Sequence, residues 1–104
     1  MKYATVGLIG KPQDEGTHVS LTALTHYLHE KGCKVLIESR LHAEMDDERL
    51  TSAELVTIGQ EADLAIVVGG DGNMLGAARV LARFPIHVVG VNRGNLGFLT
   101  DIDP

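Results

Sequence analysis

The sequence has little of what secreted, membrane-bound or nucleic-acid-binding proteins need. Its one cysteine, Cys33, cannot form a disulfide within the chain. No segment approaches the roughly 20 apolar residues that cross a bilayer, and the first residues, MKYATVGLIGK, hold too short an apolar run for a signal peptide. With Lys+Arg 9 against Asp+Glu 14, the net charge is −5, so no basic surface favours nucleic acid or an anionic membrane. We expect a cytoplasmic protein without nucleic-acid or membrane partners.

Internal repeats, low-complexity tracts and linkers are also missing from the 104 residues. A chain of this length is the size of one domain, because it can bury a single core but is too short for two. Hydrophobic residues make up 44% and charged residues 22%, which is ordinary for a globular protein. We therefore expect residues 1–104 to form one domain.

Short apolar runs alternate with segments of helical periodicity. The expected strands are residues 3–9, 33–38, 64–68 and 86–91. The expected helices are residues 17–31, residues 51–61, which open with the capping-box pattern TSAE, and residues 73–83. The polar stretch SRLHAEMDDER at 39–49 is not assigned. Because right-handed crossovers leave few alternatives, this order predicts an α/β fold, a Rossmann-like parallel sheet with helices on both faces.

Unusual residues follow three of the expected strands. Gly10 and Lys11 come after the first strand, residues 69–73 after the third and residues 92–97 after the fourth. In open parallel sheets, ligands bind beyond the carboxyl ends of the strands. The sequence therefore predicts a ligand site at this edge of the sheet.

Asp71 stands at the centre of the second of these segments, GGDGN. The spacing of Gly70, Gly72 and Gly76 is one residue longer than the dinucleotide fingerprint, and no G-K-[ST] is present, which excludes a Walker phosphate loop. Asp71 has two interpretations: a cap that stabilises a helix start, or a base that takes a proton from a substrate hydroxyl during phosphoryl transfer. The glycines leave room that a cap does not need, which favours the base.

Two motifs together resemble a known family. GGDGN at 69–73 is followed, after one expected helix and one expected strand, by NRGNLGFLTD at 92–101. This pair is similar to the two N-terminal signatures of the NAD kinase family. The resemblance implies transfer of the terminal phosphoryl group of ATP, or of polyphosphate in some members, to the 2′-hydroxyl of the adenosine ribose of NAD, which gives NADP. It also implies a divalent cation, Mg²⁺ or Mn²⁺, with the ATP.

The resemblance assigns roles to individual residues. It implies that Asp71 is the proton acceptor and that it also contacts the nucleotide with the adjacent Gly72. Phe98 is expected near the adenine, with Leu99 beside it. The nucleotide site that the resemblance implies is completed by Gly70, Asn73 and Asn92. No side chain is expected to bind the metal, and the full-length protein is expected to be a homo-oligomer, a dimer or a tetramer.

This chain departs from the family pattern in three ways. Asn73 stands where threonine is commonest, and Gly76 stands where some relatives carry a charged residue that touches the ligand. The C-terminal β-rich domain of the family, with its Asn-Glu or Asn-Asp pair, does not follow Pro104. We therefore expect the N-terminal domain of an NAD kinase, inactive in isolation. The alternative is a nucleotide- or dinucleotide-binding module without catalysis, in which Asp71 is only a cap.

The remaining polar residues have simpler interpretations. His26 and His29 are expected on a solvated helix face, and the acidic run at 46–48 on the surface. His87 is expected to be hydrogen-bonded in the core.

Four basic residues are weighed as phosphate contacts. Arg79 and Arg83 are expected on the outer face of the sheet. Lys11 and Arg93 lie at the expected ligand edge and are candidates for contacts with phosphate.

Overall fold

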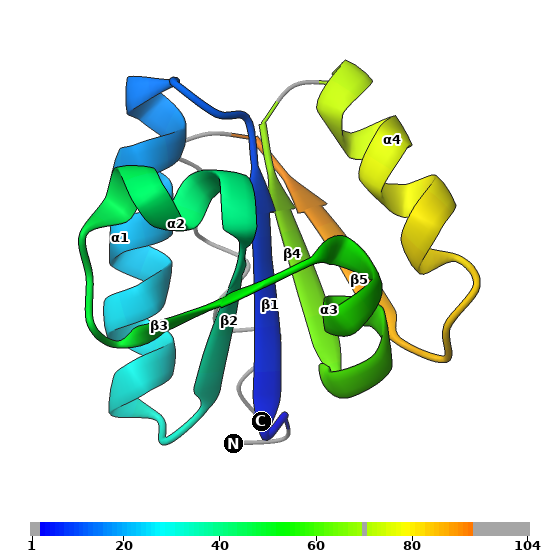
Figure 1. Cartoon of the computed structure of the whole chain (residues 1–104), viewed down its shortest axis with the longest axis horizontal. Coiled ribbons are helices and arrows are strands. Elements are labelled where there is room, and N and C mark those ends of the chain that lie inside the picture. The colour runs from blue at the N-terminus through cyan, green and yellow to red at the C-terminus, as the bar shows by residue number, and fades with distance from the viewer. Residues whose placement is uncertain (1–2, 70, 93–104) are drawn as a thin grey trace.

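The computed structural model describes residues 3–69 and 71–92, for residues 71–75 by their backbone alone. These residues form five strands and four helices (Figure 1). In chain order the elements are β1 (Thr5–Gly10), α1 (Glu15–Glu30), β2 (Lys34–Glu38), α2 (Ser39–Met45), β3 (Leu50–Ala53), α3 (Leu55–Glu61), β4 (Leu64–Val68), α4 (Asp71–Leu81) and β5 (His87–Val91). Within the described residues, no helix has the length and apolar character that a bilayer crossing requires.

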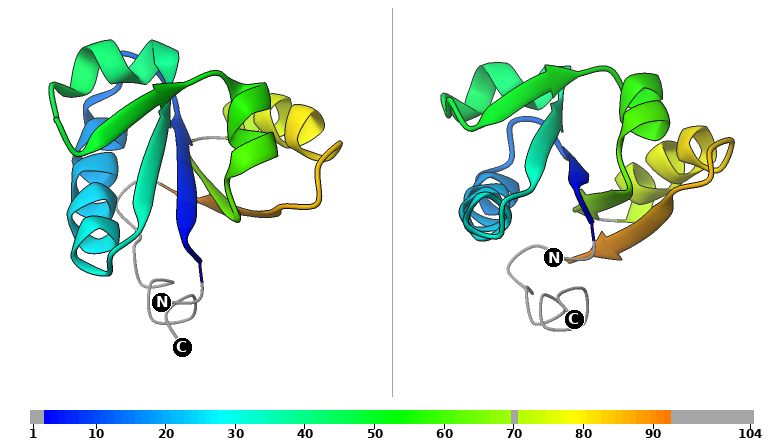
Figure 2. Two further views of the ribbon diagram at one scale, coloured as in Figure 1. Left: turned by 60° about the horizontal axis from the view of Figure 1, so that its bottom comes forward. Right: turned by 90° about the horizontal axis from the view of Figure 1, so that it is seen from below.

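The strands form one parallel sheet in the order β3-β2-β1-β4-β5. Seen from below, α1 covers one face of the sheet while α3 and α4 cover the other (Figure 2). The Rossmann-like sheet with helices on both faces that the sequence predicted is therefore confirmed.

Each face of the sheet has its own apolar core because successive side chains of a strand point to opposite faces. Val6 and Leu8 of β1 pack with the α1 leucines, Leu21, Leu24 and Leu28. Ile9 packs on the other face with a cluster that holds Ile58 of α3 and Leu81 of α4. All five residues of β4 are buried, as expected for a strand covered on both faces.

The close packing of α3 on β1 depends on Gly7. A Cβ atom at Gly7 would overlap the side chain of Ile58, which is fully buried. The missing side chain thus sets the distance between this helix and the central strand.

One predicted element was wrong in its first part, and one stretch without a prediction contains a helix. The pattern at 51–54 does not open a helix, because Leu50–Ala53 is strand β3 and pairs with β2 in the register Val35↔Leu50. α3 begins only at Leu55, and its N-cap, Glu54, makes no side-chain capping bond. The unassigned stretch at 39–49 contains α2, which follows β2 without a connecting loop.

Helix boundaries differ from the predicted ones by two residues. α1 begins at Glu15 rather than at residue 17, because Asp14 is its N-cap and its carboxylate accepts a hydrogen bond from the Thr17 N–H at 2.9 Å. α4 spans Asp71–Leu81 rather than 73–83. Arg79 and Arg83 are exposed, as predicted.

The prediction of a core role for His87 was wrong. β5 lies at the edge of the sheet, where His87 is exposed and Val88 is 39% exposed. The His87 ring does form a hydrogen bond, with its Nδ1 3.1 Å from the hydroxyl oxygen of Tyr3.

Candidate functional site

The chain reverses its direction across the sheet between β1 and β4. β2 and β3 extend the sheet on one side of β1, and β4 and β5 extend it on the other. In α/β sheets this topological switch point, at the carboxyl ends of the strands, is where ligands bind. These ends lie at the top of Figure 1, where α1 and α4 begin on opposite sides of the switch point.

The strand register brings three predicted segments to this point. Gly10 of β1 pairs with Val68 of β4, and Val68 pairs with Val91 of β5. The residues that follow these three are Lys11, Gly69 and Asn92, which therefore leave neighbouring strands at the same level. Lys11 and Asn92 are both exposed.

The turn between β4 and α4 positions Asp71. Gly69 has a φ of +147°, a conformation that favours glycine, and its N–H donates a hydrogen bond to the Val91 carbonyl at 3.1 Å. This bond ties the turn to the end of β5. α4 then begins at Asp71, so Asp71, Gly72 and Asn73 form its first turn, where backbone N–H groups have no partners within the helix. Such a helix start attracts phosphate groups.

Several predicted residues lie outside the described part of the chain. These are Gly70, Arg93, Phe98 and Leu99. The side chains of Asp71 and Asn73 are likewise outside the description. Their assigned roles stay predictions.

The loop between β1 and α1 is fixed by a contact that the sequence did not indicate. Gln13 has a φ of +57°, and its N–H donates a hydrogen bond to Glu44 Oε1 of α2 at 2.8 Å. The Nε2 atom of His18 lies 2.5 Å from the same oxygen. The Gln13 N–H, and next the His18 side chain, lower the pKa of the Glu44 carboxyl, which therefore stays charged at neutral pH. Glu44 falls in the stretch that the sequence analysis left unassigned.

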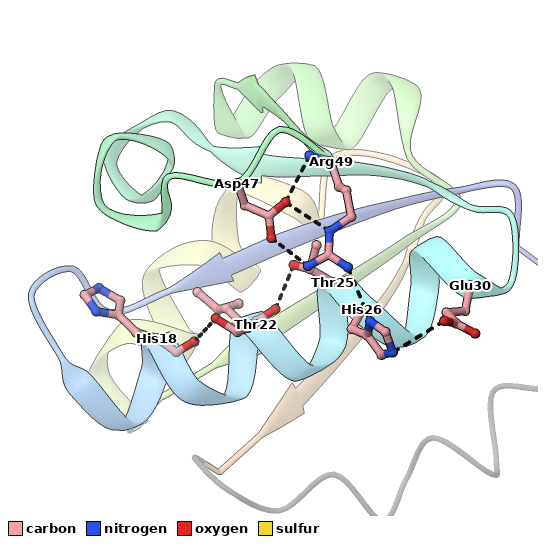
Figure 3. A network of polar contacts seen from close by, with 8 residues as sticks. His18, Thr22, Thr25, His26, Glu30, Asp47 and Arg49 are labelled. Carbon is pink, nitrogen blue, oxygen red and sulfur yellow. Dashed lines mark hydrogen bonds and ion pairs between the residues drawn. The ribbon is translucent and has the colours of Figure 1, made fainter.

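A second polar cluster joins the α2–β3 connection to the outer face of α1 (Figure 3). Arg49 donates from Nε to Asp47 Oδ1 at 3.0 Å and from Nη2 to Asp47 Oδ2 at 2.8 Å. The prediction that the acidic run at 46–48 is solvated was therefore wrong for Asp47, whose side chain is 15% exposed. The bonds from the Arg49 side chain lower the pKa of the Asp47 carboxyl.

His26 and His29 lie on the solvated face of α1, as predicted. His26 and His29 are exposed, and His26 Nε2 lies 3.5 Å from Glu30 Oε1. A shallow groove of about 560 Å³ runs along this face, lined by His18, Val19, Thr22, Ala23, His26 and Arg49. Its lining residues belong to none of the three segments at the switch point. In the described part of the chain, no group of three or more His, Cys, Asp or Glu side chains could hold a metal ion.

Comparison with known proteins identifies the family. The family model described as "ATP-NAD kinase N-terminal domain" matches residues 6–104. An NAD kinase of Shewanella frigidimarina is 59% identical over 102 residues, which cover 98% of this chain and 33% of that protein. An NAD kinase of Aeromonas salmonicida is 58% identical over 102 residues, covering 98% of this chain and 35% of that protein. The chain thus spans about a third of the length of these relatives.

A solved structure has the same fold. It is yeast NADH kinase complexed with NADH, which matches with a TM-score of 0.71 and 22% identity over 91% of this chain and 33% of that one. The resemblance inferred from the two motifs is confirmed by the family model, which matches nearly the whole chain. The chain therefore belongs to the ATP-NAD kinase family, of which it represents the N-terminal domain.

Proposed function

We propose that this chain is the N-terminal part of an NAD kinase, which phosphorylates the 2′-hydroxyl of the adenosine ribose of NAD with ATP or polyphosphate as donor. The observation that carries the proposal is the start of α4 at Asp71, at the topological switch point of the sheet. A carboxylate at that position belongs to the GGDG motif that this chain shares with its family. Membership of the family supports the reaction and its substrates.

In the proposed reaction, Asp71 acts as the general base. The ribose 2′-oxygen forms a bond to the terminal phosphorus of ATP, while the bond from that phosphorus to the bridging oxygen breaks and ADP leaves. The hydroxyl proton passes to the Asp71 carboxylate. Gly70 and Gly72, which have no side chains, would leave room for the substrate next to Asp71, and the first backbone N–H groups of α4 would stabilise phosphate charge.

The remaining contacts concern the nucleotide. Asn73 and Asn92 would complete the polar edge of the site, since Asn92 directly follows β5 and is exposed. Phe98 and Leu99 would supply an apolar surface for the adenine.

The divalent cation that the family implies, Mg²⁺ or Mn²⁺, would neutralise phosphate charge in ATP. We propose that this cation binds the ATP phosphates.

The Asp71→Asn variant of the full-length protein tests the proposal. Asparagine keeps the size of the side chain and removes the base, so NADP formation should fall by about 10²- to 10⁴-fold. NAD affinity should change little. Turnover would be measured by a coupled assay for NADP, and NAD binding by calorimetry.

Glu61→Gln is the matched control. Glu61 is an exposed acid at the end of α3, and α3 leads into the amino end of β4, away from the switch point. This variant loses the same charge and should keep wild-type turnover. Unchanged turnover in Asp71→Asn would remove the catalytic role and favour the alternative, a binding module in which Asp71 only stabilises the start of α4.

The assembly and location of the protein are also proposals. We propose a cytoplasmic homo-oligomer, a dimer or a tetramer, for the full-length protein, and no NADP formation by the isolated chain. Light scattering of the full-length protein and an assay of the isolated chain test these statements.

A further inference from the structure

We propose that Glu44 is a positioning residue that holds the β1–α1 loop at the switch point, so that Lys11 contacts the phosphate groups of the bound nucleotide. This inference rests on the proposed function for the identity of the nucleotide. It concerns residues 10–14 and α2, which lie outside both signature motifs.

Lys11 occupies the position that a phosphate contact needs. It directly follows Gly10, which pairs with Val68, so it leaves β1 beside the turn that leads to Asp71. Its side chain is exposed. Among residues 3–69 and 76–92, whose side chains the structure describes, no carboxylate forms an ion pair with its ammonium group. A lysine ammonium group at this edge would attract the phosphate groups of a nucleotide to a protein whose net charge is −5.

The loop that carries Lys11 has few accessible conformations. Pro12 has a fixed φ and restricts the residue before it, Lys11, to extended conformations. Gln13 adopts a left-handed conformation, which is unfavourable for a residue with a side chain. Such a conformation persists only where neighbouring contacts favour it.

Glu44 supplies that contact. Its Oε1 atom accepts the Gln13 N–H at 2.8 Å, 31 positions along the chain, and lies 2.5 Å from His18 Nε2. The Glu44 side chain is 22% exposed, and the His18 side chain is 32% exposed. One oxygen of α2 thus joins the loop to the first part of α1. With Gly10 held by β4 and Gln13 held by Glu44, the two intervening residues are fixed at both ends.

The test uses steady-state kinetics and ATP binding of the full-length protein. Lys11→Ala should raise the KM for ATP about tenfold, as expected for loss of one charge-assisted hydrogen bond. Glu44→Ala should raise it in the same direction, because the loop is no longer held. The double variant should be no worse than Lys11→Ala alone, since both changes remove one interaction.

Two further variants separate positioning from folding. Glu44→Gln keeps an oxygen that can accept from the Gln13 N–H and from His18, so it should restore a KM for ATP within about twofold of wild type. Glu48→Ala removes an exposed acid from the α2–β3 connection and should leave the KM unchanged. Thermal unfolding of each variant identifies loss of fold.

The outcomes distinguish the possible sources of phosphate. A rise in the KM for NAD instead of ATP assigns Lys11 to the pyrophosphate of the dinucleotide and supports the same role for Glu44. Additive effects of Lys11→Ala and Glu44→Ala, or unchanged kinetics in either, would overturn the inference.

Calorimetry with ATP keeps this inference separate from the proposed function. If the wild-type protein forms no NADP, the proposed function fails. The positioning role still stands if both alanine variants weaken ATP binding non-additively, and it fails if neither does.

Discussion

At Gly7, the absence of a side chain allows α3 to approach the central strand. Gly7→Ala would place a methyl group against Ile58, which is fully buried and cannot move aside. We expect this variant to lower the free energy of unfolding by about 1–3 kcal/mol, the usual cost of overpacking a core. Urea unfolding monitored by circular dichroism measures the change.

Gly76→Ala is the control for this substitution. Gly76 lies within α4 and is exposed, and a Cβ atom there would contact no neighbouring element of the described residues within 4 Å. Because alanine is the better helix former, this variant should be more stable by up to about 1 kcal/mol. Equal losses in the two variants would show that Ile58 does not limit the space at Gly7.

The residues of the candidate site were predictable to different degrees. The position of Asp71 after a buried strand followed from local sequence, because the apolar run ends in two glycines. Glu44 could not be found this way. Its role depends on a left-handed backbone at Gln13 and on a fold that brings α2 against the β1–α1 loop. Neither condition leaves a periodic signal in the sequence.

Among the elements, α1 depends on its cap. The Asp14 carboxylate accepts hydrogen bonds from the Thr17 N–H at 2.9 Å and from the Thr17 hydroxyl at 2.8 Å. Asp14→Ala should lower the free energy of unfolding by about 1 kcal/mol, because helix N–H groups lose their acceptor. Chemical denaturation measures this loss.

Glu54→Ala provides the comparison at the start of another helix. Glu54 precedes α3 but makes no side-chain capping bond, and its carboxylate accepts only an exposed hydrogen bond from Ser39 among the contacts of the described residues. We expect a loss smaller than that of Asp14→Ala. A larger loss at Glu54 would contradict the assignment of the caps.

The long elements were predictable because they are strongly apolar and periodic, whereas the short ones were not. β3 has four residues, of which Thr51 and Ser52 are exposed, so it lacks an apolar run. The sequence TSAE at 51–54, which overlaps β3, also matches a capping box. Residues 50–53 pair with β2 instead and form a strand. Leu41 is the buried residue of α2. With one buried residue, this helix shows no clear helical periodicity of apolar positions in the sequence.

At the scale of the whole molecule, acid should destabilise the fold partly through Asp47. The Arg49 side chain lowers the pKa of Asp47 in the folded protein. As the pH falls, the Asp47 carboxyl of the unfolded chain is therefore protonated at a higher pH than the same carboxyl in the folded protein. The contribution of Asp47 is complete above about pH 5 and disappears as the pH falls through its folded-state pKa.

Asp47→Asn tests this dependence. The difference in unfolding free energy between wild type and variant should be largest at pH 7 and should shrink as the pH falls below about 5, until the wild-type carboxyl is also neutral below its lowered pKa. Asp46→Asn is the control, since Asp46 is exposed and its left-handed backbone tolerates asparagine. A difference that stays constant from pH 7 to pH 3 would exclude the charged Asp47–Arg49 pair as its source.

β1 is the first strand of the chain and also the central strand of the sheet. Its hydrogen bonds to β4 join Val6 to Leu64, far along the chain. During synthesis, β1, β2 and β3 can therefore associate before β4, the partner of the other edge of β1, has been made. The two segments that flank the switch point meet only when β4 emerges from the ribosome, so the candidate site can assemble no earlier than this late step of folding.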